Sequence, residues 1–279
     1  MYRHGKWAQQ VLSLQHPDGS WGDFHSLSVS GGSKMTTEQA LRRLETLGFT
    51  AQDEPVRRAL DYMDDCLAGR RSIPDRREKV HDWDVFTRLI LAARIRRFTR
   101  DNVQANAVAQ QWARLTEAAF AGGMFDRAAY LAAYQEQLCP CGGRIIELEN
   151  FYPVSLLACE LTPPTQRAFV RHLLQGAAGI YYIYDRPLRH PPERFASREA
   201  SRYLAAIELL ADYPGARAEL AFAADWLDQN RLPDGRWDMG REVNDKVYFP
   251  LSDSWRREEE RIKDCTARIE AVMAKLRQP

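Results

Sequence analysis

The chain has 279 residues, of which 45% are hydrophobic and 28% are charged, an ordinary composition for a globular protein with a substantial core. Its formal net charge of +1 provides no overall field that would attract nucleic acid or an anionic membrane. No stretch reaches the roughly 18 apolar residues needed to span a bilayer, and the first residues lack the apolar run of a signal peptide. The five cysteines show no framework spacing, so we expect reduced thiols and a cytoplasmic location.

Helical periodicity dominates the chain from the N-terminus onward. Thr36 and Gln39 predict a capping box, and Gly48 closes the helix that follows. Apolar residues at helical spacing predict further helices over about residues 54–67, 82–97, 103–120, 126–137, 151–161, 164–175, 197–210, 216–229 and 256–276. The best strand signal, at residues 179–185, is short and isolated. About eleven helices with little sheet predict an all-α fold.

The sequence Asp-Gly-x-Trp occurs twice, at residues 18–21 and 234–237. Each copy follows an amphipathic helix that we expect to end in glutamine, at Gln15 and Gln229. Glycine tolerates a positive φ and aspartate can bond its own backbone, so both copies predict tight turns. We expect each glutamine to tie its helix to the turn, and each tryptophan to pack back over the junction.

These two turns resemble the Gln-Trp repeat of the squalene cyclases and protein prenyltransferases, which are rings of paired helices. Residues 36–67 and 201–229 are also similar to each other, since both predict two helices joined by a glycine-containing turn. Residues 173–181 look like a degenerate third copy, with Tyr181 in the tryptophan position. The resemblance implies an α/α toroid of about 10–12 helices, formed as a single domain over residues 1–279. Neighbouring helix pairs must stack to bury their apolar faces, but periodicity alone does not predict ring closure.

In the related class II terpene cyclases, a short Asp-rich motif heads an inner helix, and its middle Asp protonates an alkene or an epoxide. Asp82 and Asp84 match the first two aspartates of the Asp-x-Asp-Asp pattern, and Val85 replaces the next one. The resemblance implies that Asp84 is a general acid oriented by Asp82, which requires burial and like charge to raise the pKa of the acid. The alternative is that Asp82 caps the helix and Asp84 interacts favourably with the helix dipole.

Aromatic side chains could line a cavity and stabilise developing positive charge by cation–π attraction. The candidate substrate-binding residues are His81, Trp83, Phe86, Tyr181, Tyr182, Tyr184, Tyr203 and Trp255. The alternative for the tyrosines is that they pack helix pairs and keep their hydroxyl groups in water. Trp255 could equally seal the place where the chain ends meet. Asp253 and Asp264 lie near this tryptophan in the sequence and are weaker candidates for the catalytic acid.

Two residue pairs raise the question of a metal site. The protein prenyltransferases bind zinc through Asp-x-Cys and a distant histidine, and Asp64 and Cys66 have that spacing. However, Cys66 falls at the end of an expected outer helix, whereas such ligands should face the cavity. No second pair or suitably spaced histidine completes Cys139 and Cys141. We therefore predict no metal site and leave any cofactor unassigned.

Two functions follow from these residues. The resemblance implies an enzyme that acts on an isoprenoid or another apolar substrate by Asp-mediated general acid catalysis. The alternative is a non-catalytic toroid that binds a partner protein, a second copy or a small ligand. Two features favour this alternative: Val85 stands in place of an aspartate of the acid motif, and the chain has the length of a single domain. The chain has no glycine-rich phosphate loop, dinucleotide fingerprint, His-Glu-x-x-His or Gly-x-Ser-x-Gly, so nucleotide enzymes, metalloproteases and α/β-hydrolases are poorly supported.

Overall fold

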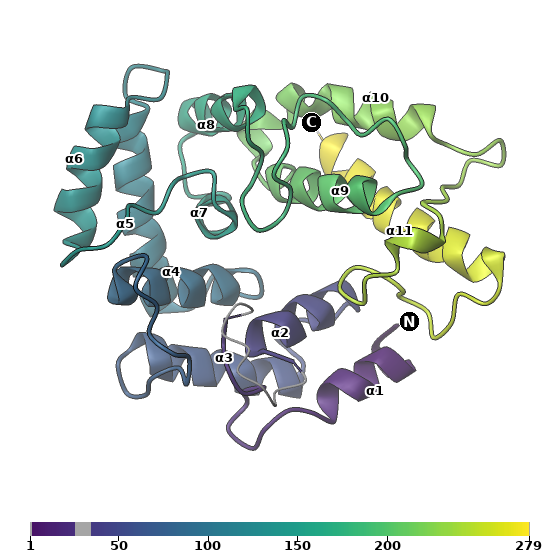
Figure 1. Cartoon of the computed structure of the whole chain (residues 1–279), viewed down its shortest axis with the longest axis horizontal. Coiled ribbons are helices and arrows are strands. Elements are labelled where there is room, and N and C mark those ends of the chain that lie inside the picture. The colour runs from purple at the N-terminus through teal and green to yellow at the C-terminus, as the bar shows by residue number, and fades with distance from the viewer. Residues whose placement is uncertain (1, 26–34, 279) are drawn as a thin grey trace. The chain divides into compact units, whose positions relative to one another are not determined.

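The computed structural model describes residues 2–25 and 35–278, and this part of the chain is helical (Figure 1). It has eleven α-helices and three short 3₁₀ helices, and its β pairing is limited to isolated bridges, which confirms the all-α fold. None of the described helices has both the length and the apolar character that a membrane crossing requires. The α-helices are α1 (Lys6–Leu12), α2 (Thr37–Thr46), α3 (Glu54–Leu67), α4 (Trp83–Arg96), α5 (Val103–Ala119), α6 (Arg127–Leu138), α7 (Phe151–Leu157), α8 (Pro163–Gln175), α9 (Arg198–Leu210), α10 (Ala221–Gln229) and α11 (Glu258–Leu276). The 3₁₀ helices are η1 (Tyr2–His4), η2 (Pro214–Leu220) and η3 (Arg241–Val243).

The chain forms two compact units, and each is assembled from segments that are distant in sequence. The first unit contains Met1–Ala109, Pro140–Arg144 and Lys246–Asp253. The second contains Gln110–Cys139, Ile145–Asp245 and Ser254–Pro279. The toroidal arrangement and the single domain over residues 1–279 stay predictions.

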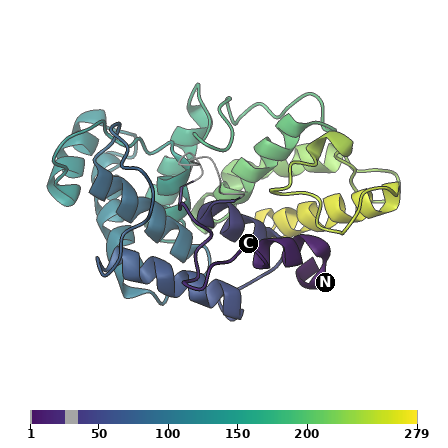
Figure 2. The ribbon, with the colours of Figure 1, turned by 60° about the horizontal axis from the view of Figure 1, so that its bottom comes forward.

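The first unit is built on pairs of helices that follow one another in the chain. α1 packs against α2 and α3 packs against α4, and Figure 2 shows these helices from a second direction. The capping box at the start of α2 is confirmed, because Thr36 and Gln39 exchange side-chain and backbone hydrogen bonds. The apolar faces of these helices are fully buried and form the core of the unit, with Leu41, Leu44, Met63, Leu89 and Ile90 among its members.

The core of the first unit also contains a charged cluster. Glu38 of α2 and Arg94 of α4 are 1% and 2% exposed, and their side chains lie 3.3 Å apart. The other carboxylate oxygen of Glu38 lies 3.2 Å from Nδ1 of His25. Asp75 in turn accepts the backbone N–H groups of Phe24 and His25. The buried charges are thus paired, which offsets the cost of removing them from water.

A strap of residues 246–253 joins the first unit from late in the sequence. Arg43 of α2 donates hydrogen bonds to two backbone carbonyls of the strap. The indole N–H of Trp7 donates to a third strap carbonyl, at 3.0 Å. The carboxylate of Asp253 accepts the first backbone N–H of α1, that of Lys6, at 2.7 Å. Asp253 was a weaker candidate for an acid from the sequence. Its carboxylate instead accepts a backbone N–H at the start of a helix, which has no partner within the helix.

Both Asp-Gly-x-Trp sequences form the predicted turns, with φ values of +90° at Gly19 and +87° at Gly235. The indole N–H of Trp21 donates to the backbone carbonyl ten residues earlier, at 2.8 Å, and that of Trp237 does the same at 2.7 Å. The backbone N–H of each tryptophan donates to a threonine hydroxyl, in α2 for Trp21 and in α11 for Trp237. The two turns are therefore equivalent in their hydrogen bonding, and each fixes a tryptophan over the end of the preceding helix.

The predicted tie between glutamine and turn is confirmed at Gln15 but is not found at Gln229. α1 ends at Leu12, so Gln15 lies beyond the helix, just before the turn. Its amide donates to the carbonyls of Gly19 and of a residue in α3, at 3.0 and 2.8 Å, so it ties the turn to the next helix pair. Gln229 does end α10, but its side chain is exposed. In the second turn the guanidinium of Arg231 lies 4.4 Å from the centre of the Trp237 ring.

The second unit departs from the predicted elements at three places. α7 ends at Leu157 rather than near residue 161, because the chain enters the left-handed region at Cys159, with φ of +63°. Residues 214–220 form η2 before α10 begins, so only the second part of the predicted helix is α-helical. Residues 179–185, the best strand signal, form a tight turn with two isolated bridges, one between Ile180 and Tyr184 and one between Tyr181 and Asn150. Tyr181 is 58% exposed, so it does not take the buried position of a turn tryptophan.

Candidate functional site

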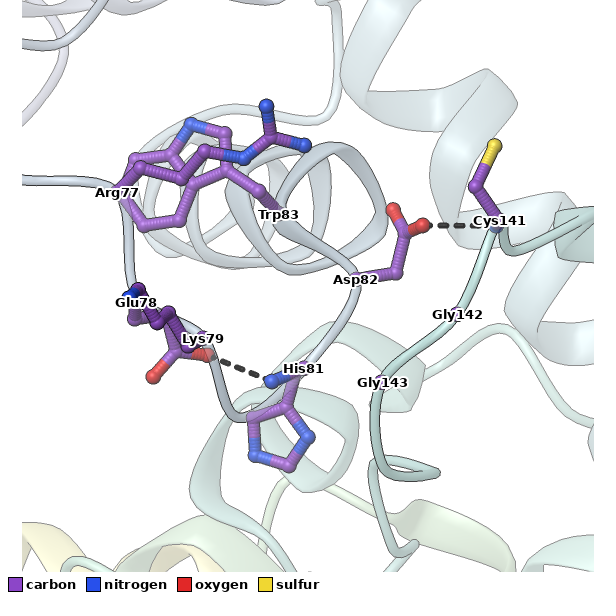
Figure 3. A pocket seen from close by; sticks show the side chains of 9 residues that line it. All are labelled: Arg77, Glu78, Lys79, His81, Asp82, Trp83, Cys141, Gly142 and Gly143. Atoms are coloured by element: carbon purple, nitrogen blue, oxygen red, sulfur yellow. Dashed lines mark hydrogen bonds between the residues drawn. The ribbon is translucent and has the colours of Figure 1, made fainter.

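The start of α4 is fixed by one carboxylate. Oδ1 of Asp82 accepts the backbone N–H groups of Asp84 and Val85, at 3.1 and 3.0 Å, which confirms the capping alternative for Asp82. Oδ2 accepts the backbone N–H of Cys141 at 2.8 Å (Figure 3). The hydrogen bond from Val85, followed by those from Cys141 and Asp84, lowers the pKa of Asp82 against the effect of burial. Asp82 is therefore ionised near neutral pH.

The segment of residues 140–144 is held closely against residues 80–82. The backbone N–H of Arg144 donates to the carbonyl of Val80 at 2.7 Å, and Nδ1 of His81 lies 3.0 Å from the carbonyl of Arg144. Gly143 has a φ of +82°, and a Cβ atom there would lie 2.5 Å from the backbone nitrogen of Asp82. Glycine is required at this position because the two backbones approach so closely.

A pocket of about 450 Å³ opens between these two segments, both of which belong to the first unit (Figure 3). Its volume falls in the range of small-molecule sites. The lining residues are Arg77, Glu78, Lys79, His81, Asp82, Trp83, Cys141, Gly142 and Gly143. Phe86 is buried behind them, with its ring 5.9 Å from that of His81 and 6.3 Å from that of Trp83. Two of the lining residues, His81 and Trp83, are therefore aromatic and contact a third, buried ring.

The charges of the pocket are not paired with one another. Glu78 accepts the backbone N–H of His81 at 3.3 Å, and Asp82 accepts the backbone donors described above. Within residues 2–25 and 35–278, neither Arg77 nor Lys79 forms an ion pair or a hydrogen bond, although the charge of Arg77 contributes to the lowered pKa of Asp82. The pocket therefore presents two cationic side chains that have no ion-pair partner among the described residues.

Four of the predicted site residues meet here. His81, Asp82 and Trp83 line the pocket, and Phe86 supports it from behind. Asp84 is exposed on the first turn of α4 and does not line the pocket. It therefore does not have the buried position that the resemblance implies for a general acid.

The other predicted aromatic residues belong to the second unit and do not line this pocket. Tyr203 is fully buried, and its hydroxyl donates to the carbonyl of Leu188 at 3.0 Å. Tyr184 packs against it with ring centres 5.3 Å apart, and burial raises the pKa of Tyr184 to about 12. The rings of Tyr181 and Tyr182 contact each other, with their centres 4.2 Å apart. Tyr184 and Tyr203 thus pack helices, as the alternative interpretation holds, but with their hydroxyl groups hydrogen-bonded inside the protein.

Trp255 is hydrogen-bonded to Asp264, which belongs to the same unit. Its indole N–H donates to the buried carboxylate of Asp264 at 2.7 Å. This hydrogen bond joins the segment before α11 to α11 itself. Trp255 and Asp264 are therefore packing partners, and neither lines the pocket.

The residue pairs considered for zinc have other partners. The carboxylate of Asp64 accepts hydrogen bonds from Arg70 and Asn102, each at 2.7 Å. Burial raises the pKa of the Cys66 thiol to about 11, so it is not a thiolate near neutral pH. In the part of the chain that the structure describes, no three metal-ligating side chains come together.

The sequence analysis missed six of the nine lining residues. Arg77, Glu78 and Lys79 belong to a charged run that ends just before the helix cap, which is a usable signal for a polar rim. Cys141, Gly142 and Gly143 are separated from the cap by about sixty residues, and only the Gly-Gly pair indicated a close backbone approach. Comparison of the chain with protein-family models, curated proteins and solved structures gives no match.

Proposed function

We propose that this protein is a non-catalytic helical binding module that takes up a small anionic ligand with an apolar or planar portion in the pocket at the start of α4. The observation that carries the proposal is the pair of cations, Arg77 and Lys79, which line the pocket and form no ion pair or hydrogen bond within the described residues. Arg70, in contrast, forms an ion pair with Asp64 at 2.7 Å. The rings of Trp83 and His81 suit the apolar or planar portion of such a ligand.

The state of the two aspartates favours binding over acid catalysis. A general acid must hold a proton at the working pH, and the pKa of Asp82 is lowered rather than raised. Asp84 is exposed and outside the pocket. The aspartate that lines the pocket is therefore not set up to protonate a ligand.

The test is calorimetric titration with geranyl diphosphate, an anion with an apolar tail, and with geraniol, which has the same tail and no charge. We expect the diphosphate to bind and geraniol not to bind. Arg77→Gln and Lys79→Gln should each weaken diphosphate binding by about fivefold, because each removes one charge-assisted contact.

Arg76→Gln is the matched control, since Arg76 is an exposed neighbour that does not line the pocket. It should bind like the wild type. Equal losses in Arg76→Gln and Arg77→Gln would show that only the general charge of the segment matters, and the proposed site would be wrong.

The two equivalent Asp-Gly-x-Trp turns favour a second candidate, a terpenoid-cyclase-like or prenyltransferase-like enzyme built as an α/α toroid. In that case Asp84 is the general acid, and the substrate is an isoprenoid. Asp84→Asn should then abolish product formation from geranyl, farnesyl or squalene-type substrates while the helical circular dichroism signal is retained. Mass spectrometry of wild-type incubations, with and without magnesium and zinc, decides between the two candidates, because a binding module yields no product.

A further inference from the structure

An imidazole is the side chain that ordinarily changes its charge near neutral pH, and His81 is the one histidine among the lining residues. Its Nδ1 lies 3.0 Å from the carbonyl oxygen of Arg144. A carbonyl oxygen can only accept a hydrogen bond, so Nδ1 carries the proton in the neutral ring. Nε2 is then the unprotonated nitrogen, and within the described residues it has no protein partner.

The side chain is held in this orientation from two sides. The carbonyl of Arg144 fixes one ring nitrogen, and the ring of Phe86 stacks on the imidazole with an interplanar angle of 26°. Protonation therefore changes the chemistry at Nε2 without requiring a new orientation of the ring. Nε2 becomes a positively charged donor on a residue that lines the pocket together with Arg77 and Lys79.

We infer that His81 is a proton-gated third anion-binding group of the pocket, so that the site binds its anionic ligand more tightly as the pH falls through the range in which histidine titrates. The inference rests on the proposed function, because it concerns the same site. The inference adds that occupancy of the site depends on pH. A neutral imidazole offers the anionic ligand only a lone pair at Nε2, whereas an imidazolium offers it a charged N–H.

The groups that face His81 do not supply this response themselves. They are Arg77, Glu78, Lys79 and Asp82 on its own segment, Cys141 and Arg144 on the segment opposite, and the uncharged rings of Trp83 and Phe86 on α4. Carboxyl, ammonium and guanidinium groups ordinarily titrate outside about pH 5.5 to 8, and a cysteine thiol ordinarily titrates above it. A pH response within that range is therefore assigned to the imidazole.

The test uses naphthalene-1-sulfonate, since a sulfonate keeps its charge throughout this range and the response then comes from the protein. Titrations at about pH 5.5 and about pH 8 lie on either side of the ordinary histidine pKa of about 6.5. We expect binding to be about tenfold tighter at the lower pH, the effect of one added charge-assisted hydrogen bond. His81→Asn can keep the donor to the Arg144 carbonyl but has no titrating nitrogen, so its ratio of affinities should fall to about one.

His190→Asn, at an exposed histidine that does not line the pocket, should retain the wild-type ratio. A tenfold ratio that persists in His81→Asn, or equal wild-type affinity at both pH values, overturns the inference and leaves the proposed function standing. Absence of binding at both pH values overturns the proposed function and the inference with it.

A second measurement does not depend on a variant that folds. Imidazole ¹⁵N spectra of the wild-type protein follow the protonation of His81 directly. By linkage, saturating naphthalene-1-sulfonate should raise the pKa of His81, because the protonated form binds the anion more tightly. An unchanged His81 titration in the presence of bound probe would overturn the inference.

Discussion

Glu38 is buried in the core of the first unit, where it meets His25 on one side and Arg94 and Arg42 on the other. Burial alone raises the pKa of a carboxyl group. In Glu38 the hydrogen bond to His25 and the charges of Arg42 and Arg94 outweigh burial, and the pKa falls well below its usual value of 4.5. The carboxylate is therefore charged in the folded protein at every pH at which the protein is ordinarily studied.

The lowered pKa of Glu38 predicts how the free energy of unfolding depends on pH. A carboxyl group with a lowered pKa in the folded state stabilises the fold fully above its unfolded pKa, and this stabilisation is lost as the pH falls toward the folded pKa. We therefore expect the free energy of unfolding to fall as the pH is lowered from about 5 to about 3, and urea unfolding at several pH values measures it. Glu38→Gln should lower it by about 3 kcal/mol at neutral pH, because Arg94 is left buried beside an uncharged group.

Glu54→Gln is the matched control, because Glu54 is 57% exposed and forms only a surface pair with Arg58. It should change the unfolding free energy by less than about 1 kcal/mol. Similar losses in the two variants, or an unchanged acid response in Glu38→Gln, would contradict the role assigned to the buried cluster.

Among the elements, the two Asp-Gly-x-Trp turns show how a short pattern fixes a junction between helices. In both turns the tryptophan uses its backbone and indole N–H groups to join a preceding helix to a later one, α1 to α2 and α10 to α11. The aspartate of each turn accepts the backbone N–H two residues later, at 3.1 Å. The same side chains thus do the same task at two places in the chain.

From this equivalence we expect Trp21→Phe and Trp237→Phe to destabilise the protein by similar amounts, about 1 kcal/mol each. Each change keeps an aromatic ring but removes the indole donor from a helix-end carbonyl, which then keeps only a backbone N–H at 3.2 Å. Trp83→Phe should have a much smaller effect on urea unfolding, because the Trp83 indole N–H has no protein acceptor among the described residues. A negligible effect of Trp237→Phe alone would mean that the two turns are not energetically equivalent.

At the scale of the whole molecule, chain segments from distant parts of the sequence complete both the first unit and its pocket. The strap of residues 246–253 supplies carbonyls to Arg43 and Trp7, and Asp253 satisfies the start of α1. Residues 140–144 supply one wall of the pocket. The sequence of neither segment predicts which residues it contacts, because long-range contacts depend on where the intervening helices place the chain.

The candidate site was predictable only in the part that one segment provides. His81, Asp82 and Trp83 are consecutive and precede an evident helix, so a site centred on them could be predicted. Asp84 was placed at that site by its spacing from Asp82, yet the helix turns its position to solvent. Tyr203 and Tyr184 were predicted as ligand contacts on their aromatic character alone, and they contact each other instead.

The sequence by itself determined the helices, their caps and the two tryptophan turns, because these depend on residues within about ten positions of one another. The position of Gln15, the early end of α7 and the 3₁₀ start before α10 were decided by tertiary contacts and by backbone conformation at single residues. Only the tertiary structure decided which side chains share the pocket and which charges lack a partner there. The physical reason is that burial and pairing are properties of neighbours in space, and those neighbours come from segments about sixty or more residues apart.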